Sequence, residues 1–316
     1  MTGFGMTLDG KLICIFGGGG FLGRYISQQL LSRGARVRIA ERNVKNAMHI
    51  KPLGNLGQTQ FASADVTKKD SVARAVHQCD AVINLVGVFG SDMEMVNVTG
   101  ARNVAEAASA AGCSALVQMS AIGADTNSPS LYGQSKARGE QAARDAFPGA
   151  IIIRPSIVFG REDEFINRFA GLIQMLPIVP IIGADAKFQP VYVGDVAAAA
   201  ANVLADSGKY AGKLFEIGGP EVITMGELNR RIAASTAREP VFIEVPDFAA
   251  RLLAMLPGSP ISTDQYKMLQ VDNVTSGTAL GLDDLGVAPT SLAALTPGWL
   301  EQYTEHGRFG ARAKIA

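Results

Sequence analysis

A glycine-rich turn between an apolar run and an amphipathic one is the feature that most constrains the fold of this chain. Gly17, Gly20 and Gly23 are spaced three residues apart, after Leu12–Phe16 and at the start of Phe21–Leu31. The first glycine permits a tight turn, the second allows close approach of a diphosphate, and the third lets the helix pack on the strand. The diphosphate would face the free N–H groups of the helix N-terminus. The pattern therefore predicts a strand, a turn and a helix that bind a dinucleotide.

Apolar runs alternate with helical stretches through the first half of the chain. The predicted strands are Leu12–Phe16, Val37–Ala40, Gln60–Ser63, Ala81–Val86, Leu116–Ser120 and Ile151–Arg154. The predicted helices are Phe21–Leu31, Lys69–His77, Val96–Ala111 and Ser135–Phe147. This alternation is typical of βαβ units, which build a parallel sheet covered by helices on both faces. We expect an α/β protein with a doubly wound parallel (Rossmann) sheet and a ligand at the carboxyl ends of the strands.

Prolines recur after Pro155 and divide the rest of the chain into shorter elements. Helices are predicted at Phe165–Met175, Val193–Ala205 and Met225–Ser235, and strands at Leu214–Ile217 and Val241–Val245. We therefore predict a dinucleotide-binding domain at 1–157, to which 190–218 return. Residues 158–189 and 219–316 would form a smaller C-terminal α/β lobe.

Composition excludes several classes of function. The 316 residues have a formal net charge of zero, which does not suggest a nucleic-acid partner. Charged residues make up only 18% and the mean hydropathy is +0.17; a large buried sheet and a partner- or membrane-facing surface both explain this. No apolar run approaches the roughly 18 residues that span a bilayer. The cysteines and histidines show no ligand spacing, so we predict no metal site.

The segment Tyr132–Lys136 carries the candidate acid/base chemistry. Its tyrosine and lysine are four residues apart, so on a helix they share one face. A nearby ammonium favours the phenolate, and we expect it to lower the pKa of Tyr132. The pair follows the fifth predicted strand, where it would face a bound nicotinamide.

Several further segments resemble the short-chain dehydrogenase/reductase superfamily in its extended or atypical branch. They are the glycine turn, Ala64–Val66, Asn84–Gly87, Asn97–Gly100, the Tyr132/Lys136 pair and Arg154–Ser156. The resemblance implies a cofactor site formed by Gly17, Gly19, Gly20, Phe21, Leu22, Gly23, Asp65, Val66, Leu85, Val86, Gly87, Tyr132, Lys136, Pro155 and Ser156. In that family the residues at Asp65 and Val66 hold the adenine, and Lys136 binds the nicotinamide ribose. A helix-cap role for Asp65 and an ordinary strand-end turn at Asn84 remain open.

Longer segments are similar to the nucleotide-binding accessory subunits of respiratory complex I (NADH:ubiquinone oxidoreductase), which are atypical reductase-like proteins. These segments are Pro52–Gln58, Asp145–Pro148, Phe159–Asp163 and Gln189–Val196. The similarity implies bound NADP(H), a structural or assembly role, and other complex I subunits near the quinone and membrane junction as partners, with lipid contact. The absence of an import signal favours a bacterial member, peripheral on the cytoplasmic face of the inner membrane.

The resemblance also bears on catalysis. Reductases of the extended branch place a serine after the fifth strand, and here the register gives either Ser120 or Ala121. We favour Ala121, which would leave the substrate oxygen without that hydrogen bond. Tyr132 and Lys136 would then be vestigial in catalysis and serve the ribose. The alternatives are a free-standing NAD(P)-dependent reductase or epimerase for a nucleotide sugar or small carbonyl compound, and a nucleotide-sensing regulator.

Two adjacent residues at the end of the second predicted strand bear on cofactor choice. An acid such as Glu41 binds the adenosine ribose and favours NAD(H), whereas Arg42 can pair with the 2′-phosphate of NADP(H). Glu41 would repel that phosphate unless it turns away or pairs with an arginine. We predict NADP(H) as the preferred cofactor, with NAD(H) possible.

A short apolar helix is predicted at Phe248–Leu256, with Arg251 as its one basic residue. This composition suits a helix at a membrane interface, and it suits equally a buried helix of the lobe. A further helix should begin near Ser262 or Thr263, one of which would be its N-cap.

Overall fold

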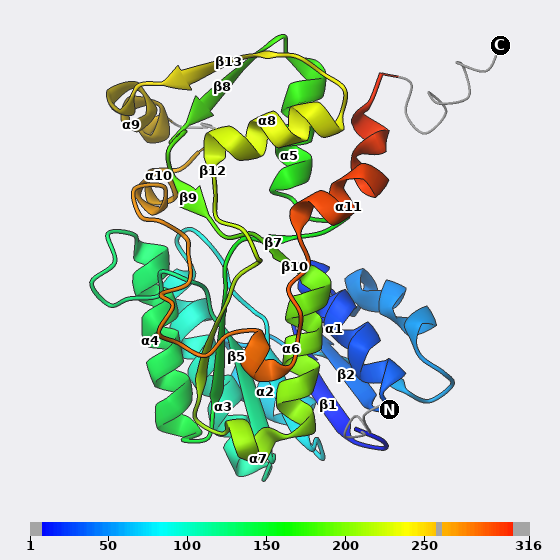
Figure 1. Ribbon diagram of the computed structural model, residues 1–316. Coiled ribbons are helices and arrows are strands. Elements are labelled where there is room, and N and C mark those ends of the chain that lie inside the picture. The colour runs from blue at the N-terminus through cyan, green and yellow to red at the C-terminus, as the bar shows by residue number, and fades with distance from the viewer. Residues whose placement is uncertain (1–7, 257–260, 306–316) are drawn as a thin grey trace, which may run out of the picture. The chain divides into compact units, whose positions relative to one another are not determined.

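The computed structural model describes residues 8–256 and 261–305, which divide into two compact units (Figure 1). The first unit contains the described residues up to Pro155, Val193–Ile217 and Ser276–Ala288. The second contains Ser156–Tyr192, the described part of Gly218–Thr275, and the described residues from Pro289. The sequence prediction assigns 276–288 to the lobe, whereas the structure groups these residues with the first unit. The outer ends of the predicted ranges, 1–7 and 306–316, lie outside the described residues.

The first unit is built on a seven-stranded sheet in which every pair of neighbours is parallel. Its strands are β1 (Leu12–Phe16), β2 (Arg36–Glu41), β3 (Thr59–Ser63), β4 (Ala81–Asn84), β5 (Ala115–Met119), β6 (Ile151–Pro155) and β11 (Leu214–Ile217). The order β11-β6-β5-β4-β1-β2-β3 reverses between β4 and β1. A ligand crevice opens at such a switch point, beyond the carboxyl ends of the strands. The predicted doubly wound sheet is confirmed.

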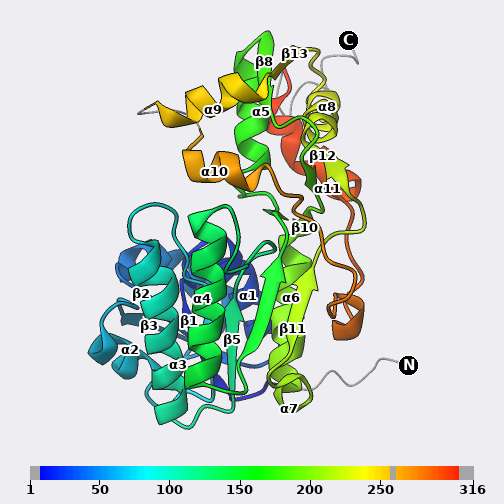
Figure 2. The ribbon, with the colours of Figure 1, turned by 90° about the vertical axis from the view of Figure 1, so that its left-hand side faces the viewer.

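Helices cover both faces of this sheet (Figure 2). One face carries α1 (Phe21–Ser32) beside α6 (Val193–Ala205), and the other carries α2 (Lys69–Val76), α3 (Gly100–Ala110) and α4 (Leu131–Ala146). All five residues of β1 are buried, as expected for a strand packed on both sides. The core under α2, α3 and α4 includes Val72, Val104, Leu116 and Ala143. These layers fix the glycine turn and the start of α4 at the same end of the sheet.

The segment 276–288 protects the open edge of the sheet beside β11. Glu216 N donates to Leu280 O at 2.9 Å, and Asn202 Nδ2 on α6 donates to Leu285 O at 2.7 Å. An uncovered edge would leave backbone groups free to pair with another chain. These hydrogen bonds explain why a segment so late in the sequence belongs to the first unit.

Two predicted helices have different limits in the structure. Ser130 Oγ accepts a hydrogen bond from Gly133 N at 2.9 Å, and this N-cap starts α4 at Leu131 rather than at Ser135. The stretch predicted as one helix at Val96–Ala111 consists of a π-helical turn, η2 (Glu94–Thr99), followed by α3. Turns of this kind occur frequently at functional sites.

The second unit has its own core of helices and short strands. Its elements are β7 (Val158–Phe159), α5 (Ile166–Met175), β8 (Ile178–Ile182), β9 (Lys187–Phe188), β10 (Val191–Tyr192), β12 (Ile223–Thr224), α8 (Met225–Ser235), β13 (Val241–Val245), α9 (Asp247–Met255), α10 (Thr263–Met268), α11 (Leu292–Trp299) and η4 (Leu300–Tyr303). Phe159, Ile166, Leu228 and Trp299 lie in the core. Ser262 is the N-cap of α10, as one of the two predicted alternatives.

Helix α9 confirms the predicted apolar helix and shows how its faces differ. Ala250 and Ala254 are buried against Tyr266, whereas Phe248, Leu252 and Met255 are 76%, 64% and 67% exposed. The small residues therefore pack on the unit and the large apolar ones face outward. Across the part of the chain that the structure describes, no helix has the length and apolar character needed to cross a membrane.

Candidate functional site

The glycine turn joins β1 to α1 with the geometry that its sequence predicts. Gly17 has φ +76°, which favours glycine, and a Cβ on Gly23 would lie 2.5 Å from Gly18 Cα. Gly20 is the N-cap of α1, and no side chain caps this helix among the described residues. The main-chain donors of the first turn, at Phe21 and Leu22, are therefore directed to the end of the sheet where an anion could accept from them.

Glu41, at the end of β2, lies against this turn. Its Oε1 accepts a hydrogen bond from Gly19 N at 2.9 Å, and a Cβ on Gly19 would meet Ala47 Cβ at 2.8 Å. Arg42 is exposed beside it. The structure shows neither of the two outcomes predicted for Glu41: among the described residues it pairs with no arginine, and its carboxylate faces the glycine turn, where it accepts from Gly19 N.

Asp65 and Val66 follow β3 and make mainly local contacts. Asp65 Oδ1 accepts from Thr67 N at 3.0 Å and from Thr67 Oγ1 at 2.7 Å, and these hydrogen bonds lower the pKa of Asp65. Val66 is buried, and its main-chain O accepts from Asn103 Nδ2 at 2.8 Å. The carboxylate thus organises the turn before α2.

The segment after β4 connects the glycine turn to helix α4. A Cβ on Gly17 would lie 3.4 Å from Leu85 Cβ and from Val86 Cγ2. Gly87 directly follows Val86, and a Cβ on Gly87 would lie 3.4 Å from Lys136 Nζ. The structure therefore brings Gly17, Leu85, Val86, Gly87 and Lys136 into one row along the carboxyl ends of β1, β4 and β5.

Two buried asparagines hold this row in place. Asn84 Nδ2 donates to Gln118 Oε1 at 2.9 Å and its Oδ1 accepts from Val86 N at 3.2 Å. Asn97, in the π-helical turn, bonds both main-chain groups of Val88 and donates to Ser135 Oγ at 2.9 Å. Asn97 lies in a segment that carries the superfamily resemblance, but sequence reasoning gave it no role.

Lys136 is 6% exposed, and its Nζ donates to Met119 O at 2.8 Å. Burial lowers the pKa of Lys136 to about 8, and the charge of Glu140 acts in the opposite direction. At neutral pH the group is therefore a buried ammonium beside the row of glycines. It is placed to donate to hydroxyl or phosphate oxygens of a ligand.

The expected lowering of the pKa of Tyr132 is wrong. The phenol ring is stacked under Phe89, with centroids 4.0 Å apart and an interplanar angle of 18°. Burial raises the pKa of Tyr132 to about 12, because desolvation disfavours the phenolate. The Tyr132–Lys136 spacing could predict neither the stacking of Phe89 on the ring nor the burial that raises the pKa.

Three more predicted residues lie at the ends of β5 and β6. Ser120 N donates to Ile153 O at 2.7 Å, while Ser120 Oγ is buried without a hydrogen-bond partner among the described residues. Pro155 ends β6, and its O accepts from Ile122 N at 3.0 Å. Ser156 begins the second unit, where its Oγ lies 2.6 Å from Asn273 Oδ1.

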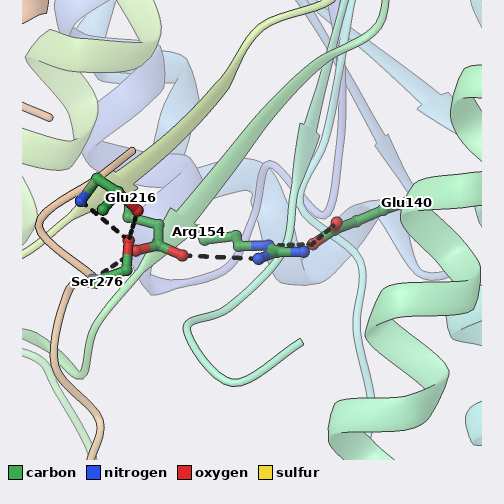
Figure 3. A network of polar contacts seen from close by, with 5 residues as sticks. Glu140, Arg154, Glu216 and Ser276 are labelled. Atoms are coloured by element: carbon green, nitrogen blue, oxygen red, sulfur yellow. Dashed lines mark hydrogen bonds and ion pairs between the residues drawn. The ribbon is translucent and has the colours of Figure 1, made fainter. Parts of the chain in front are cut away.

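A charged network that sequence reasoning missed lies one helical turn beyond Lys136 (Figure 3). Arg154 Nε and Nη2 donate to the two carboxylate oxygens of Glu140 at 2.8 and 2.7 Å. Arg154 Nη1 lies 3.6 Å from Glu216 Oε1, whose Oε2 accepts from Ser276 N at 2.7 Å. The sequence does contain residues that could have indicated this network: a glutamate four residues after Lys136 and an arginine at the end of a predicted strand.

The site combines a glycine turn, the main-chain donors at the start of α1, a buried ammonium and a hydroxyl that has no partner in the described part of the chain. These features fit a dinucleotide: the turn suits a diphosphate, the Lys136 ammonium has donors beyond the one that Met119 O accepts, and the Ser120 hydroxyl has no partner among the described residues. Proton transfer by Tyr132 near neutral pH is disfavoured.

The chain belongs to the NAD dependent epimerase/dehydratase family, whose sequence model matches residues 13–218. This family membership supports binding of a nicotinamide dinucleotide. The chain also shares the fold of the Bordetella bronchiseptica enzyme WbmG, which was solved in complex with NAD. The two structures have a TM-score of 0.71 and 18% sequence identity, and the match covers 96% of each chain.

Within this family, the chain is similar to NADH dehydrogenase (ubiquinone) 1 alpha subcomplex subunit 9, mitochondrial. The Mus musculus protein is 37% identical over 298 residues, which cover 90% of this chain and 78% of the relative. The Arabidopsis thaliana protein of the same name is 33% identical over 331 residues, covering 98% and 82%. The resemblance found in the sequence is confirmed.

Proposed function

We propose that this chain is an NADP(H)-binding accessory subunit of respiratory complex I, with a structural or assembly role and little catalysis of its own. The observation that carries the proposal is its similarity, over most of both chains, to relatives named as NADH dehydrogenase subunits. The dinucleotide would strengthen the first unit by binding its folded form.

The row of residues at the switch point supports the following nucleotide site. The diphosphate would lie at the glycine turn and the first turn of α1, with Lys136 on the nicotinamide ribose. The remaining proposed contacts are Gly17, Gly19, Gly20, Phe21, Leu22, Gly23, Arg42, Asp65, Val66, Leu85, Val86, Gly87, Tyr132, Pro155 and Ser156. The nucleotide would supply hydride chemistry only if a substrate reached it.

Two observations argue against efficient turnover: the pKa of Tyr132 is raised to about 12, and Phe89 stacks on its ring. In the register that we favour, Ala121 would also stand where reductases place the serine, whereas the other register gives Ser120. Turnover of a carbonyl substrate by the purified protein, lost in Tyr132→Phe, would instead identify a free-standing reductase or epimerase.

The second unit exposes apolar side chains suited to a partner. Ile178 on β8 and Val241 and Ile243 on β13 are more than half exposed, and α9 presents Phe248 and Leu252. Exposed apolar patches mark interaction sites when they are large and contiguous. We propose that these surfaces contact other complex I subunits or lipid near the quinone junction, on the cytoplasmic face of a bacterial inner membrane.

Native electrophoresis of detergent-solubilised membranes tests this assignment. We expect the chain to migrate with NADH:quinone oxidoreductase activity, and its deletion to lower the amount of assembled complex. Migration only at the size of the free protein, with the complex unchanged on deletion, would contradict the proposal.

For cofactor choice, we predict that Arg42→Ala weakens NADPH binding at least about tenfold, the effect of losing one charge-assisted phosphate contact. NADH binding should change little, because NADH carries no 2′-phosphate with which Arg42 could pair. Titration calorimetry with both nucleotides checks this. Arg36→Ala, exposed at the opposite end of β2, is the matched control; equal losses of NADPH and NADH affinity in Arg42→Ala would remove the assignment.

A further inference from the structure

We infer that Phe89 is a specificity-determining residue: its ring covers the ring of Tyr132 and keeps small carbonyl compounds from the Tyr132 hydroxyl. The inference deepens the proposed function, on which it rests for the bound nucleotide. It names one side chain that would let this family member hold a nucleotide without turning over a substrate.

The two rings are in direct contact. Their centroids lie 4.0 Å apart and their planes are 18° from parallel, so that the ring carbons touch and no third group fits between them. Phe89 is 54% exposed, whereas Tyr132 is half-buried, which places Phe89 on the solvent side of the pair. A compound that approaches this face of Tyr132 from solution therefore meets Phe89 first.

Phe89 is held in this position through the residue before it. Asn97, which is 3% exposed, accepts from Val88 N at 2.9 Å and donates to Val88 O at 3.0 Å. Its Nδ2 also donates to Ser135 Oγ at 2.9 Å, and Ser135 Oγ donates to Tyr132 O at 2.8 Å. One buried amide thus connects the loop that carries Phe89 to the helix that carries Tyr132, and the stacked pair is part of the framework of the first unit.

This contact bears directly on the reaction that Tyr132 could support. A carbonyl oxygen must come within hydrogen-bond distance of the Tyr132 hydroxyl to receive its proton, and the rest of the substrate needs space beside the ring. Phe89 fills that space on the face that it covers. It also keeps water from the ring, which acts in the same direction as the burial that disfavours the phenolate.

Nitration by tetranitromethane tests this shield, because the reagent is small and attacks accessible phenolates. With mass spectrometry to locate the product, Tyr132 in Phe89→Ala should react at least about tenfold faster than in the unaltered protein, since the ring is uncovered and water returns to it. Phe89→Trp, which keeps a ring over Tyr132, should react slowly. Met95→Ala, at another exposed apolar side chain of the first unit, is the matched control and should leave the rate unchanged.

Turnover is measured in the same variants with NADPH and a small aldehyde. Phe89→Ala should be at least about tenfold faster than the unaltered protein, a small part of what a positioned proton donor contributes. This gain should disappear in Phe89→Ala/Tyr132→Phe. Phe89→Leu, which keeps apolar bulk without a flat ring, provides both measurements if Phe89→Ala does not fold.

An unchanged nitration rate of Tyr132, in a variant that circular dichroism shows to be folded, would overturn the inference. Equal turnover by the unaltered protein and Phe89→Ala would overturn it as well. Nitration requires no nucleotide, so a failure of NADPH to bind would remove the proposed function, while the nitration rates would still decide whether Phe89 shields Tyr132.

Discussion

Arg154→Met is expected to lower the free energy of unfolding by about 3–5 kcal/mol, as is typical when one partner of a buried ion pair is removed. Glu140 is 5% exposed and both of its carboxylate oxygens accept from Arg154. The substitution would leave this carboxylate buried without its cation, and would also leave Glu216 unpaired. Chemical denaturation followed by circular dichroism measures the loss.

The paired substitution Glu140→Leu/Arg154→Met is the control. Because both charges of this pair are replaced by apolar groups, the part of the loss caused by the buried Glu140 carboxylate should return, although Glu216 still lacks its cation. Arg138→Met, which breaks an exposed pair with Glu94, should cost no more than about 1 kcal/mol. Equal, small losses for Arg154→Met and Arg138→Met would contradict the role given to the buried network.

Two substitutions in the glycine turn should distinguish effects on the free energy of unfolding from effects on NADPH affinity. A Cβ on Gly23 would lie 2.5 Å from Gly18 Cα and from Gly18 O, both backbone atoms that cannot rotate away. We expect Gly23→Ala to force α1 from the turn, lowering stability by about 1–3 kcal/mol. NADPH affinity should fall at least about a hundredfold, since the third glycine sets the helix against the strand.

Gly20→Ala is the matched comparison. Its backbone, at φ −79°, suits any residue, and its Cβ would meet only Gly17 O at 3.4 Å. Stability should therefore hardly change, whereas NADPH affinity should fall about a hundredfold because the methyl group occupies the path of the diphosphate. If Gly20→Ala binds NADPH normally, the diphosphate does not lie at this turn.

Much of the first unit could be predicted because local pattern and tertiary environment agree. The strand Leu12–Phe16 is apolar at every position and lies buried on both faces. A continuous apolar run is what a strand inside a covered parallel sheet requires, so the sequence alone predicts the position of this strand. The return of 276–288 to β11 was missed, because it depends on backbone hydrogen bonds between distant segments. The two-residue strands, such as β7 and β10, were missed for the same reason.

Within the candidate site, the sequence spacing predicted that Tyr132 and Lys136 share a helix but not the environment of either side chain. The Tyr132–Lys136 pair lies on one helix as predicted, yet the direction of the tyrosine pKa shift was wrong because burial outweighs the neighbouring cation. A glutamate at position 140 in a helix is usually a surface residue. Glu140 is instead buried and paired with Arg154 of β6, and this contact between distant segments can be seen only in the structure.

We propose that the glycine turn of this family member binds a nicotinamide dinucleotide as a resident ligand. Titration calorimetry of the purified, nucleotide-stripped protein with NADPH and with NADH tests it most directly. We predict saturable heat at a single site, with NADPH the tighter ligand and both signals abolished by Gly23→Ala. Absence of heat with either nucleotide, from a protein that is folded by circular dichroism, would contradict the account.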